Sequence, residues 1–160
     1  MAMWVCRSGT DAKHYDAFKY NNVIFLAWDG FDINLNSFTD KNDLRAYVIN
    51  ERHTDNRTSV SNWIGQLISF SKEMKSGEYV LIPNRRSRTY SLAKIIGDYE
   101  YRKFPNTDLY HSHDIEFLYH DIPREIFDQD IVYSLGAYRT LFKVREEKRV
   151  LDTIKKHCQL

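Results

Sequence analysis

The chain is poor in cysteine, proline and glycine, and each shortage excludes a class of protein. Its 2 cysteines, Cys6 and Cys158, lie near opposite ends of the 160 residues, so they form neither a zinc-type cluster nor a disulfide framework. The 3 prolines and 6 glycines are too few for a low-complexity or fibrous sequence. We therefore expect a folded domain with reduced thiols, as is usual in the cytoplasm.

Long hydrophobic runs are missing as well. No apolar run approaches the roughly 18 residues that a membrane-spanning helix needs. The first residues, Met-Ala-Met-Trp-Val-Cys-Arg, lack the charged and then apolar regions of a secretory signal. We expect a soluble, cytoplasmic protein without a membrane partner, and its length suits one domain.

Charge of one sign is not in excess either, because 23 Lys and Arg nearly balance 22 Asp and Glu. The net charge of +1 excludes nucleic-acid binding through an overall basic surface, so any such site must be a local patch. Aromatic residues, by contrast, are abundant at 14%. Since that exceeds what a core of this size needs, we expect some rings to be exposed for stacking on bases or partners.

The sequence also lacks the motifs of the common enzyme classes. It contains no P-loop, no Gly-x-Gly-x-x-Gly and no Gly-x-Ser-x-Gly. A metal-dependent nuclease needs an acid, and then an acid two residues before a lysine, on adjacent strands; the best-placed lysine, Lys94, has Leu92 at that spacing. Cys6 lies in an apolar stretch, where a thiol is more typical of the core than of catalysis.

The densest set of candidate metal ligands lies between residues 111 and 121. In an extended strand His111 and His113 would share one face, but no known zinc spacing accompanies them. We expect a non-enzymatic protein with no metal, no cofactor and no catalytic residue. A small metal-dependent enzyme that uses this set is the alternative. The set consists of His111, His113, Asp114, His120 and Asp121.

Residues 79–82 and 90–96 are apolar runs joined by a basic turn, which predicts a β-hairpin. The turn has three guanidinium groups within four residues, which is too high a density of charge for a buried turn. Either they hold a phosphate chain at the mouth of a small sheet, or they are a solvated hairpin tip. The three are Arg85, Arg86 and Arg88.

Further strands are expected over residues 4–7, 23–28, 115–119 and 138–144. The continuous apolar run 23–28 is typical of a central strand that is buried on both faces. Because the connections do not form regular β-α-β units, the pattern predicts the α+β class. We expect a small barrel-like mixed sheet of about six strands with helices between them.

Helices are expected in the connections between these strands. A capping box at residues 37–40 predicts a helix up to Asn50, followed by a mobile polar loop over residues 51–59. A second apolar face predicts a helix that starts at Ser61 or Asn62, with Gly65 at a close backbone contact. Residues 124–129 are expected to make a helical turn, and residues 150–158 a closing helix.

Aromatic and basic side chains gather at the expected strand ends. Trp28 ends the run 23–28 beside Asp29, a place at the rim of the sheet where ligands bind. Rings and cations together would form a cage for a flipped or single-stranded base. For Trp63, on the apolar face of its helix, packing in the core is the alternative. The other members of the proposed site are Tyr99, Tyr101, Arg7, Arg85, Arg86 and Arg88.

These stretches, in their order along the chain, resemble the PUA-like modified-base readers. The resemblance is to the EVE-like domain that lies N-terminal in Mrr-type and related modification-dependent restriction endonucleases. It rests on Trp4-Val-Cys-Arg-Ser-Gly, Ala27-Trp-Asp-Gly, Gly77-Glu-Tyr-Val-Leu-Ile-Pro, Ala93-Lys-Ile-Ile-Gly-Asp-Tyr-Glu-Tyr, Ile122-Pro-Arg and Thr140-Leu-Phe.

The resemblance implies a PUA-like curved mixed sheet, or small β-barrel, of about six strands with flanking helices. It also implies a pocket in which aromatic side chains hold a modified base. By position, Trp28 would supply the ring, while Arg7, Ser8 and Gly9 line the exit of the first strand. It implies DNA carrying a modified base as the partner, and a role as the targeting domain of a restriction or phage-defence system. Distant relatives, the YTH domains, keep an RNA-binding module open as the alternative.

The resemblance also implies a division of the chain. Residues 1–144 would form the nucleic-acid-binding domain, and residues 145–160 a C-terminal helix that links it to an effector. A nuclease or NTPase activity would then reside in that separate effector domain, in the same chain or in another protein.

Overall fold

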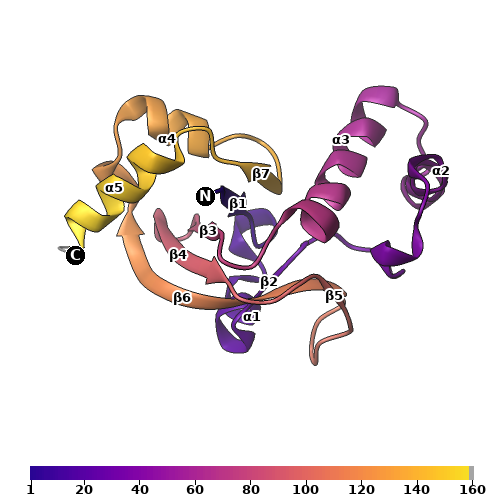
Figure 1. Cartoon of the computed structure of the whole chain (residues 1–160), viewed down its shortest axis with the longest axis horizontal. Coiled ribbons are helices and arrows are strands. Elements are labelled where there is room, and N and C mark those ends of the chain that lie inside the picture. The colour runs from indigo at the N-terminus through magenta and orange to yellow at the C-terminus, as the bar shows by residue number, and fades with distance from the viewer. Residues whose placement is uncertain (159–160) are drawn as a thin grey trace.

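Within residues 1–158, which the computed structural model describes, seven strands form one curled sheet (Figure 1). The strand order is β2-β6-β4-β3-β1-β7, and β5 pairs with β6 outside this path. The predicted α+β class with a curved mixed sheet is therefore confirmed. The strands are β1 (Met3–Cys6), β2 (Val23–Phe25), β3 (Tyr79–Asn84), β4 (Thr89–Ile95), β5 (Glu100–Tyr101), β6 (His111–Pro123) and β7 (Leu141–Lys143).

The curl of the sheet originates largely in its longest strand. β6 pairs with β4 along most of its length, and the register shifts between Tyr90 and Leu92 and again before Ala93. Such irregularities bend a strand and increase its twist. β1 and β3 form the one parallel pair among residues 1–158, and the other edge of β1 pairs antiparallel with β7. These pairings bring the end of β1 next to the start of β7.

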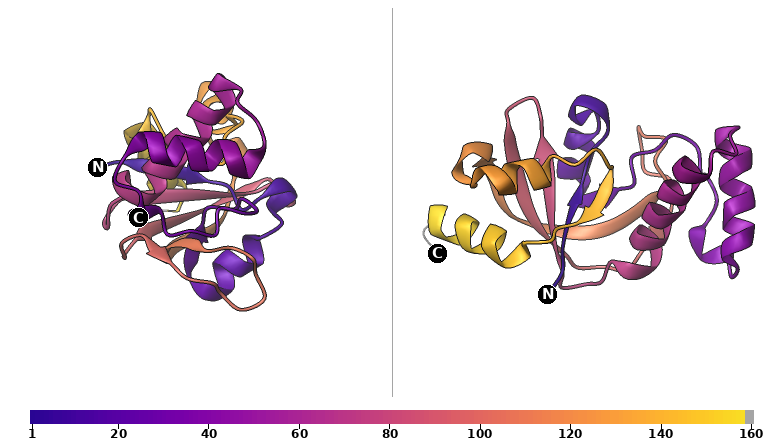
Figure 2. Two further views of the ribbon diagram at one scale, coloured as in Figure 1. Left: turned by 90° about the vertical axis from the view of Figure 1, so that its right-hand side faces the viewer. Right: turned by 90° about the horizontal axis from the view of Figure 1, so that it is seen from above.

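Four helices lie at the two ends of the long axis of the molecule, while α1 lies near its middle (Figure 1). In the view from above, α4 and α5 occupy one end, and α2 and α3 project from the other (Figure 2). Short 3-10 turns occupy residues 10–12, 35–37 and 124–126, and a π-turn, Ser69–Glu73, extends α3. The helices are α1 (Tyr15–Asn21), α2 (Lys41–Arg52), α3 (Arg57–Ile68), α4 (Gln129–Leu135) and α5 (Glu147–His157).

Both faces of the sheet are covered, so the chain has two core clusters. Successive β1 residues show the division, because Trp4 packs in one cluster while Met3 and Val5 pack in the other. The first cluster lies under α1, α2 and α3, and the second under α4 and α5. β3, β4 and β6 likewise contribute buried side chains to both clusters.

Placing residues 23–28 at the centre of the sheet was wrong. β2 covers only Val23–Phe25 and stands at one end of the strand order. Its side chains are nevertheless buried, because neighbouring segments cover this edge. Phe25 packs on Phe18 of α1, with ring centroids 5.6 Å apart, and on Phe104 at 4.8 Å. An apolar run identifies a buried strand but does not distinguish a covered edge from the centre.

The predicted helix starts needed correction at two places. Asp40, rather than Ser37, caps α2, and its Oδ1 accepts a hydrogen bond from the N–H of Asn42 at 2.8 Å. α3 begins at Arg57 after Asn56, instead of at Ser61 or Asn62. In both cases the first turn is polar and solvent-exposed, so hydrophobic spacing gave no sign of it. The expected loop over residues 51–59 shrinks to residues 53–56.

Two further details differ from the sequence predictions. A Cβ atom added at Gly65 would meet no atom within 4 Å, so the expected close backbone contact is absent there. α4, with buried Ile131 and Leu135, was not predicted at all. The central hairpin, the helical turn after Pro123, the last strand and the closing helix are confirmed.

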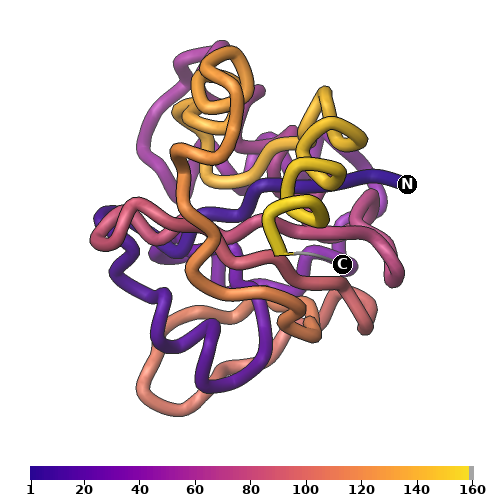
Figure 3. Tube along the Cα trace, turned by 90° about the vertical axis from the view of Figure 1, so that its left-hand side faces the viewer, coloured from indigo at the N-terminus to yellow at the C-terminus, as the bar shows by residue number. Residues whose placement is uncertain are grey.

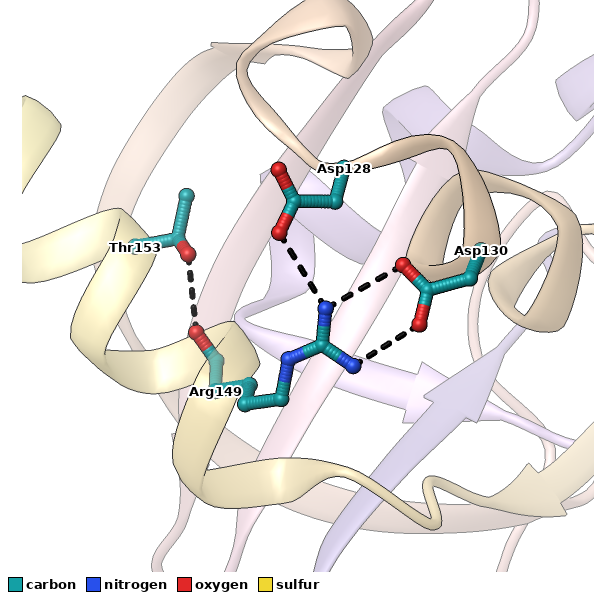
Figure 4. A network of polar contacts seen from close by, with 4 residues as sticks. All are labelled: Asp128, Asp130, Arg149 and Thr153. Atoms are coloured by element: carbon teal, nitrogen blue, oxygen red, sulfur yellow. Dashed lines mark hydrogen bonds and ion pairs between the residues drawn. The ribbon is translucent and has the colours of Figure 1, made fainter.

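α5 packs on the domain through apolar and ionic contacts. Val150 and Ile154 are buried in the second core cluster, and in the end-on view α5, in yellow, stands in front of the strands (Figure 3). The Arg149 guanidinium binds both oxygens of Asp130, at 2.8 and 3.1 Å, and one of Asp128 at 3.1 Å (Figure 4). The segment is thus part of the folded unit, while its role as a link to an effector stays a prediction.

Candidate functional site

Three chain segments and the β3–β4 hairpin enclose a cavity of about 320 Å³ at the end of β1. The segments are residues 7–12 after β1, residues 27–28 after β2, and residues 138–140 before β7. Pro83 and Arg85 of the hairpin complete the wall. We call this cavity the Trp28 pocket. Its volume is at the lower end of the range typical of small-ligand sites.

The pairing of β1 with β7 builds one side of the Trp28 pocket. Cys6 faces Leu141 in the antiparallel register, so the residues that follow β1 lie beside those that precede β7. The N–H of Arg7 donates a hydrogen bond to the Thr140 carbonyl at 2.8 Å, which extends this pairing into the pocket wall. Segments separated by more than a hundred residues in sequence are thereby held together.

The loop that follows β1 has an unusual backbone. Gly9, Asp11 and Ala12 all have φ in the left-handed region, at 94°, 54° and 57°. Glycine is required at the first, since a Cβ there would also lie 3.1 Å from Cδ2 of His14. The Arg86 guanidinium donates to the Ala12 carbonyl at 3.0 Å and ties this loop to the hairpin tip. Residues held in such conformations cluster at ligand-binding sites.

Two polar atoms in the segment after β1 are buried without a hydrogen-bond partner. Ser8 is 1% exposed, and its Oγ has no hydrogen-bond partner within residues 1–158. Nε of Arg7 is also buried and has no hydrogen-bond partner within residues 1–158. Because buried polar groups in native proteins are nearly always hydrogen-bonded, these atoms suit a ligand that supplies the missing partners.

The ring of Trp28 is half-buried in the wall. Its Nε1 donates to Thr140, and one side packs near Phe31, with ring centroids 5.8 Å apart. Tyr138, 94% exposed, stands at the same cavity with its ring 6.0 Å from the Arg7 guanidinium. The Trp28 pocket therefore combines two aromatic rings with an unsatisfied hydroxyl.

The Trp28 pocket is also cationic. Arg7, Arg85 and Arg139 line it together with one acidic residue, Asp11, and none of the three arginines forms an ion pair within the described part of the chain. Arg7 donates to the carbonyls of Gly136 and Ala137 at 3.2 and 2.6 Å. Burial lowers the pKa of Arg7, and the neighbouring positive charge of Arg85 lowers it further. Such repulsion between unpaired cations favours a negatively charged ligand.

Of the residues predicted from the sequence, five come together in this cavity, namely Arg7, Ser8, Gly9, Trp28 and Arg85. Arg86 supports the wall through Ala12, and Arg88 lies on the far side of the hairpin tip. Asp29 is exposed next to Trp28 but does not line the cavity.

The remaining predicted rings are not brought to the Trp28 pocket. Trp63 packs against the first core cluster, with the Arg52 guanidinium 5.5 Å from its ring. Tyr99 donates to Nδ1 of His111 at 2.7 Å, and Tyr101 donates to the Asp32 carbonyl. Each ring thus has a structural role of its own, and none of the three lines the Trp28 pocket.

The histidines of the candidate metal set are engaged with protein groups. His111 contacts Tyr99 through Nδ1 and the Phe31 carbonyl through Nε2. His113 contacts the Gly97 and Phe70 carbonyls through its two ring nitrogens, at 3.0 and 2.6 Å. No group of three or more His, Cys, Asp or Glu within residues 1–158 has the arrangement of a metal site.

Sequence reasoning missed Tyr138, Arg139 and Thr140 as pocket residues. Residues 138–144 were read as one strand, although β7 begins only at Leu141. Only the pairing of β7 with β1 reveals that the preceding residues lie at the pocket. The signal available in the sequence was the cluster of an aromatic, a basic and a hydroxyl residue directly before a short strand.

A family model described as a domain of unknown function (DUF8426) matches residues 3–143. The chain belongs to this family. The matched region begins with β1 and ends with β7, so the family's domain contains the whole sheet and every residue of the Trp28 pocket. No curated protein matches the chain. In residues 1–158 none of the helices has both the length and the apolar character needed to cross a membrane.

Proposed function

We propose that this domain binds nucleic acid by accommodating one base in the Trp28 pocket, and that its target is DNA carrying a modified base. The observation that carries the proposal is the combination of a half-buried indole and a buried hydroxyl without a partner in one cationic cavity. A flipped or single-stranded base needs these three features, because it is stacked, read at its edge and flanked by phosphates.

Each feature has a residue to provide it. Trp28 and Tyr138 supply π-faces, Ser8 supplies a hydroxyl for the base edge, and Arg7 with Arg85 supplies positive charge. With a net charge of only +1 over the chain, a concentrated cationic site also accounts for affinity without an overall basic surface. The resemblance to PUA-like modified-base readers is the basis for proposing a modified base. It is also the basis for proposing that the domain targets a separate effector.

Fluorescence anisotropy with labelled oligonucleotides tests this proposal. Single-stranded and duplex DNA with methylated or hydroxymethylated bases is titrated against unmodified DNA of the same sequence and against RNA. We expect tighter binding to one modified DNA, and loss of that preference in Trp28→Ala. Trp63→Phe, at a ring outside the Trp28 pocket, is the matched control and should bind like the wild type.

Equal and weak binding to every oligonucleotide would contradict the proposal. Tighter binding to RNA would assign the pocket to a ribonucleotide base instead. If Trp28→Ala retains the preference for the modified DNA, the base binds to another part of the surface.

A further inference from the structure

A second cavity, of about 440 Å³, lies on the other side of Arg7 and Arg85. These two arginines and Pro83 line both cavities, so the two are contiguous. Arg88 and Arg124 complete the positive lining of the second cavity. We call it the arginine pocket, and define it by Arg7, Arg85, Arg88, Arg124 and the ring of Tyr90.

No carboxylate lines the arginine pocket. Its four arginines form none of the ion pairs found among residues 1–158. The chain has almost as many acidic as basic residues, and Arg149 demonstrates how completely an arginine can be paired here. Four unpaired guanidinium groups around one cavity are therefore a local concentration of charge that only an anion would compensate.

The backbone holds these arginines in place. The N–H of Arg124 donates to the Arg88 carbonyl at 3.1 Å, which joins the end of β6 to the start of β4. Arg88 has φ 56°, a left-handed conformation at the hairpin turn. Arg7 is fixed by its bonds to the Gly136 and Ala137 carbonyls. The positive groups are thus arranged before any ligand arrives, which reduces the entropy lost on binding.

The buried Tyr90 side chain lies where the fields of several of these arginines converge. Burial raises the pKa of the Tyr90 phenol, and the positive charges of Arg124, Arg7 and Arg85 oppose that rise. Arginines from three separate segments therefore act on one hydroxyl. The cavity in front of Tyr90 has the positive potential and the guanidinium geometry that bind phosphate oxygens.

We infer that the arginine pocket binds a phosphate group of the same nucleic acid whose base enters the Trp28 pocket. This step rests on the proposed function for the identity of the ligand. A base and the phosphate of its own nucleotide are joined by one sugar, so a base pocket and a phosphate pocket must adjoin. The shared wall of Arg7, Pro83 and Arg85 meets that requirement.

The first experiment uses inorganic phosphate alone as the probe. NMR titration follows the arginine Nε–H signals of the whole chain, with chloride at equal ionic strength as the reference. We expect saturable shifts at Arg7, Arg88 and Arg124, and at least about tenfold weaker binding in Arg124→Gln. Arg145→Gln, which removes an exposed arginine outside both pockets, is the matched control and should bind phosphate like the wild type.

The second experiment repeats the oligonucleotide titration with the same variants. We expect Arg124→Gln to weaken binding about tenfold while the preference for the modified base is retained. Arg88→Gln provides a second test, and circular dichroism verifies that each variant is folded. Oligonucleotides with and without a 5′-phosphate then distinguish a terminal phosphate from an internal one.

The two experiments separate this inference from the proposed function. Saturable phosphate binding without base preference would overturn the base pocket and retain the phosphate site. Base preference with equal affinities for Arg124→Gln and Arg145→Gln would overturn the phosphate site and retain the base pocket. Phosphate shifts that do not saturate, or that are the same in both variants, would also overturn it.

Discussion

The indole N–H of Trp28 donates a hydrogen bond to Thr140 Oγ1, at 2.9 Å, across 112 positions of sequence. This bond fixes the orientation of the indole in the wall of the Trp28 pocket. It also joins the segment after β2 to the segment before β7. The ring face is consequently held in one orientation before a ligand binds, as a stacking platform requires.

We predict that Trp28→Ala lowers affinity for the recognised nucleic acid by roughly 1–3 kcal/mol, the range for a lost base–aromatic stack. Trp28→Phe should retain most of that affinity. Since the indole is only half-buried, Trp28→Ala should cost less stability than the roughly 3–5 kcal/mol of a fully buried tryptophan. Anisotropy and urea unfolding measure the two quantities. If Trp28→Ala unfolds the domain, the indole is a core residue rather than a platform.

We predict that the arginines at the hairpin tip have separable roles. Arg88→Gln should reduce the slope of log K against log salt by about 0.9 for duplex DNA, or about 0.7 for a single strand, as expected for one lost phosphate contact. Arg86→Gln should instead release the loop at Ala12, because its guanidinium binds that carbonyl. Binding measured over a series of salt concentrations tests both. Identical slopes for wild type and Arg88→Gln would exclude a phosphate contact at Arg88.

We predict that Cys6 is unreactive in the folded protein. Its thiol is fully buried and contacts the Phe25 carbonyl at 3.4 Å, and burial raises its pKa from 9.0 to about 12. Cys158, which is partly exposed, should react with a thiol reagent at pH 8. Mass spectrometry after labelling, with and without urea, counts the modified thiols. Rapid labelling of Cys6 without urea would contradict its burial.

The same raised pKa predicts a loss of stability in alkali. The unfolded chain ionises Cys6 above pH 9, whereas the folded chain resists ionisation up to about pH 12. The stabilisation is therefore complete below pH 9 and disappears as the pH rises towards 12. Unfolding of Cys6→Ala should lack this contribution.

We predict that His111→Phe destabilises the domain by about 1–3 kcal/mol for each group left unsatisfied. The imidazole donates to the Phe31 carbonyl through Nε2 and accepts from the Tyr99 hydroxyl through Nδ1. Neither group has a replacement partner in phenylalanine. His157→Phe, on the exposed last turn of α5, is the control. Urea unfolding that finds both variants equally stable would contradict the role of His111.

A pH dependence accompanies this prediction. Burial lowers the pKa of His111 from 6.5, so the folded chain favours the neutral ring. Below pH 6.5 the unfolded chain binds the proton first, and stability falls as the pH decreases. This part of the decline should be absent in His111→Phe, which urea unfolding between pH 8 and 5 measures.

The sequence predicted the elements whose hydrophobic pattern is local. The hairpin of β3 and β4 and the α5 helix each show their period within a dozen residues or so. The polar first turns of α2 and α3 carry no such period, so their starts were misplaced. β2 lies at the end of the sheet, and its side chains are buried because Phe104 and α1 cover its outer edge. The sequence of the strand itself does not reveal this cover.

The candidate site was predictable in part for the same reason. Trp28 and Arg7 follow short apolar runs, so their location at strand ends could be inferred from local sequence. Arg124 and Thr140 reach the two pockets only through the pairings of β6 with β4 and of β7 with β1. Long-range pairings of this kind leave no trace in a single sequence, and Trp63 and Tyr99 were misassigned to the cage because their neighbours were equally invisible.

The location of β1 between β3 and β7 has a consequence for folding. β1 is the earliest strand in the chain, yet its partners begin at Tyr79 and Leu141. During synthesis it therefore has no neighbour in the sheet until β3 has been made, and its second edge stays open until β7 has been made. Contacts of such high sequence separation slow folding towards the millisecond-to-second range. Pulse-labelling hydrogen exchange should find the β1 amides protected after those of the β3–β4 hairpin. The Trp28 pocket includes residues 138–140, so a chain that stops before them lacks one of its walls.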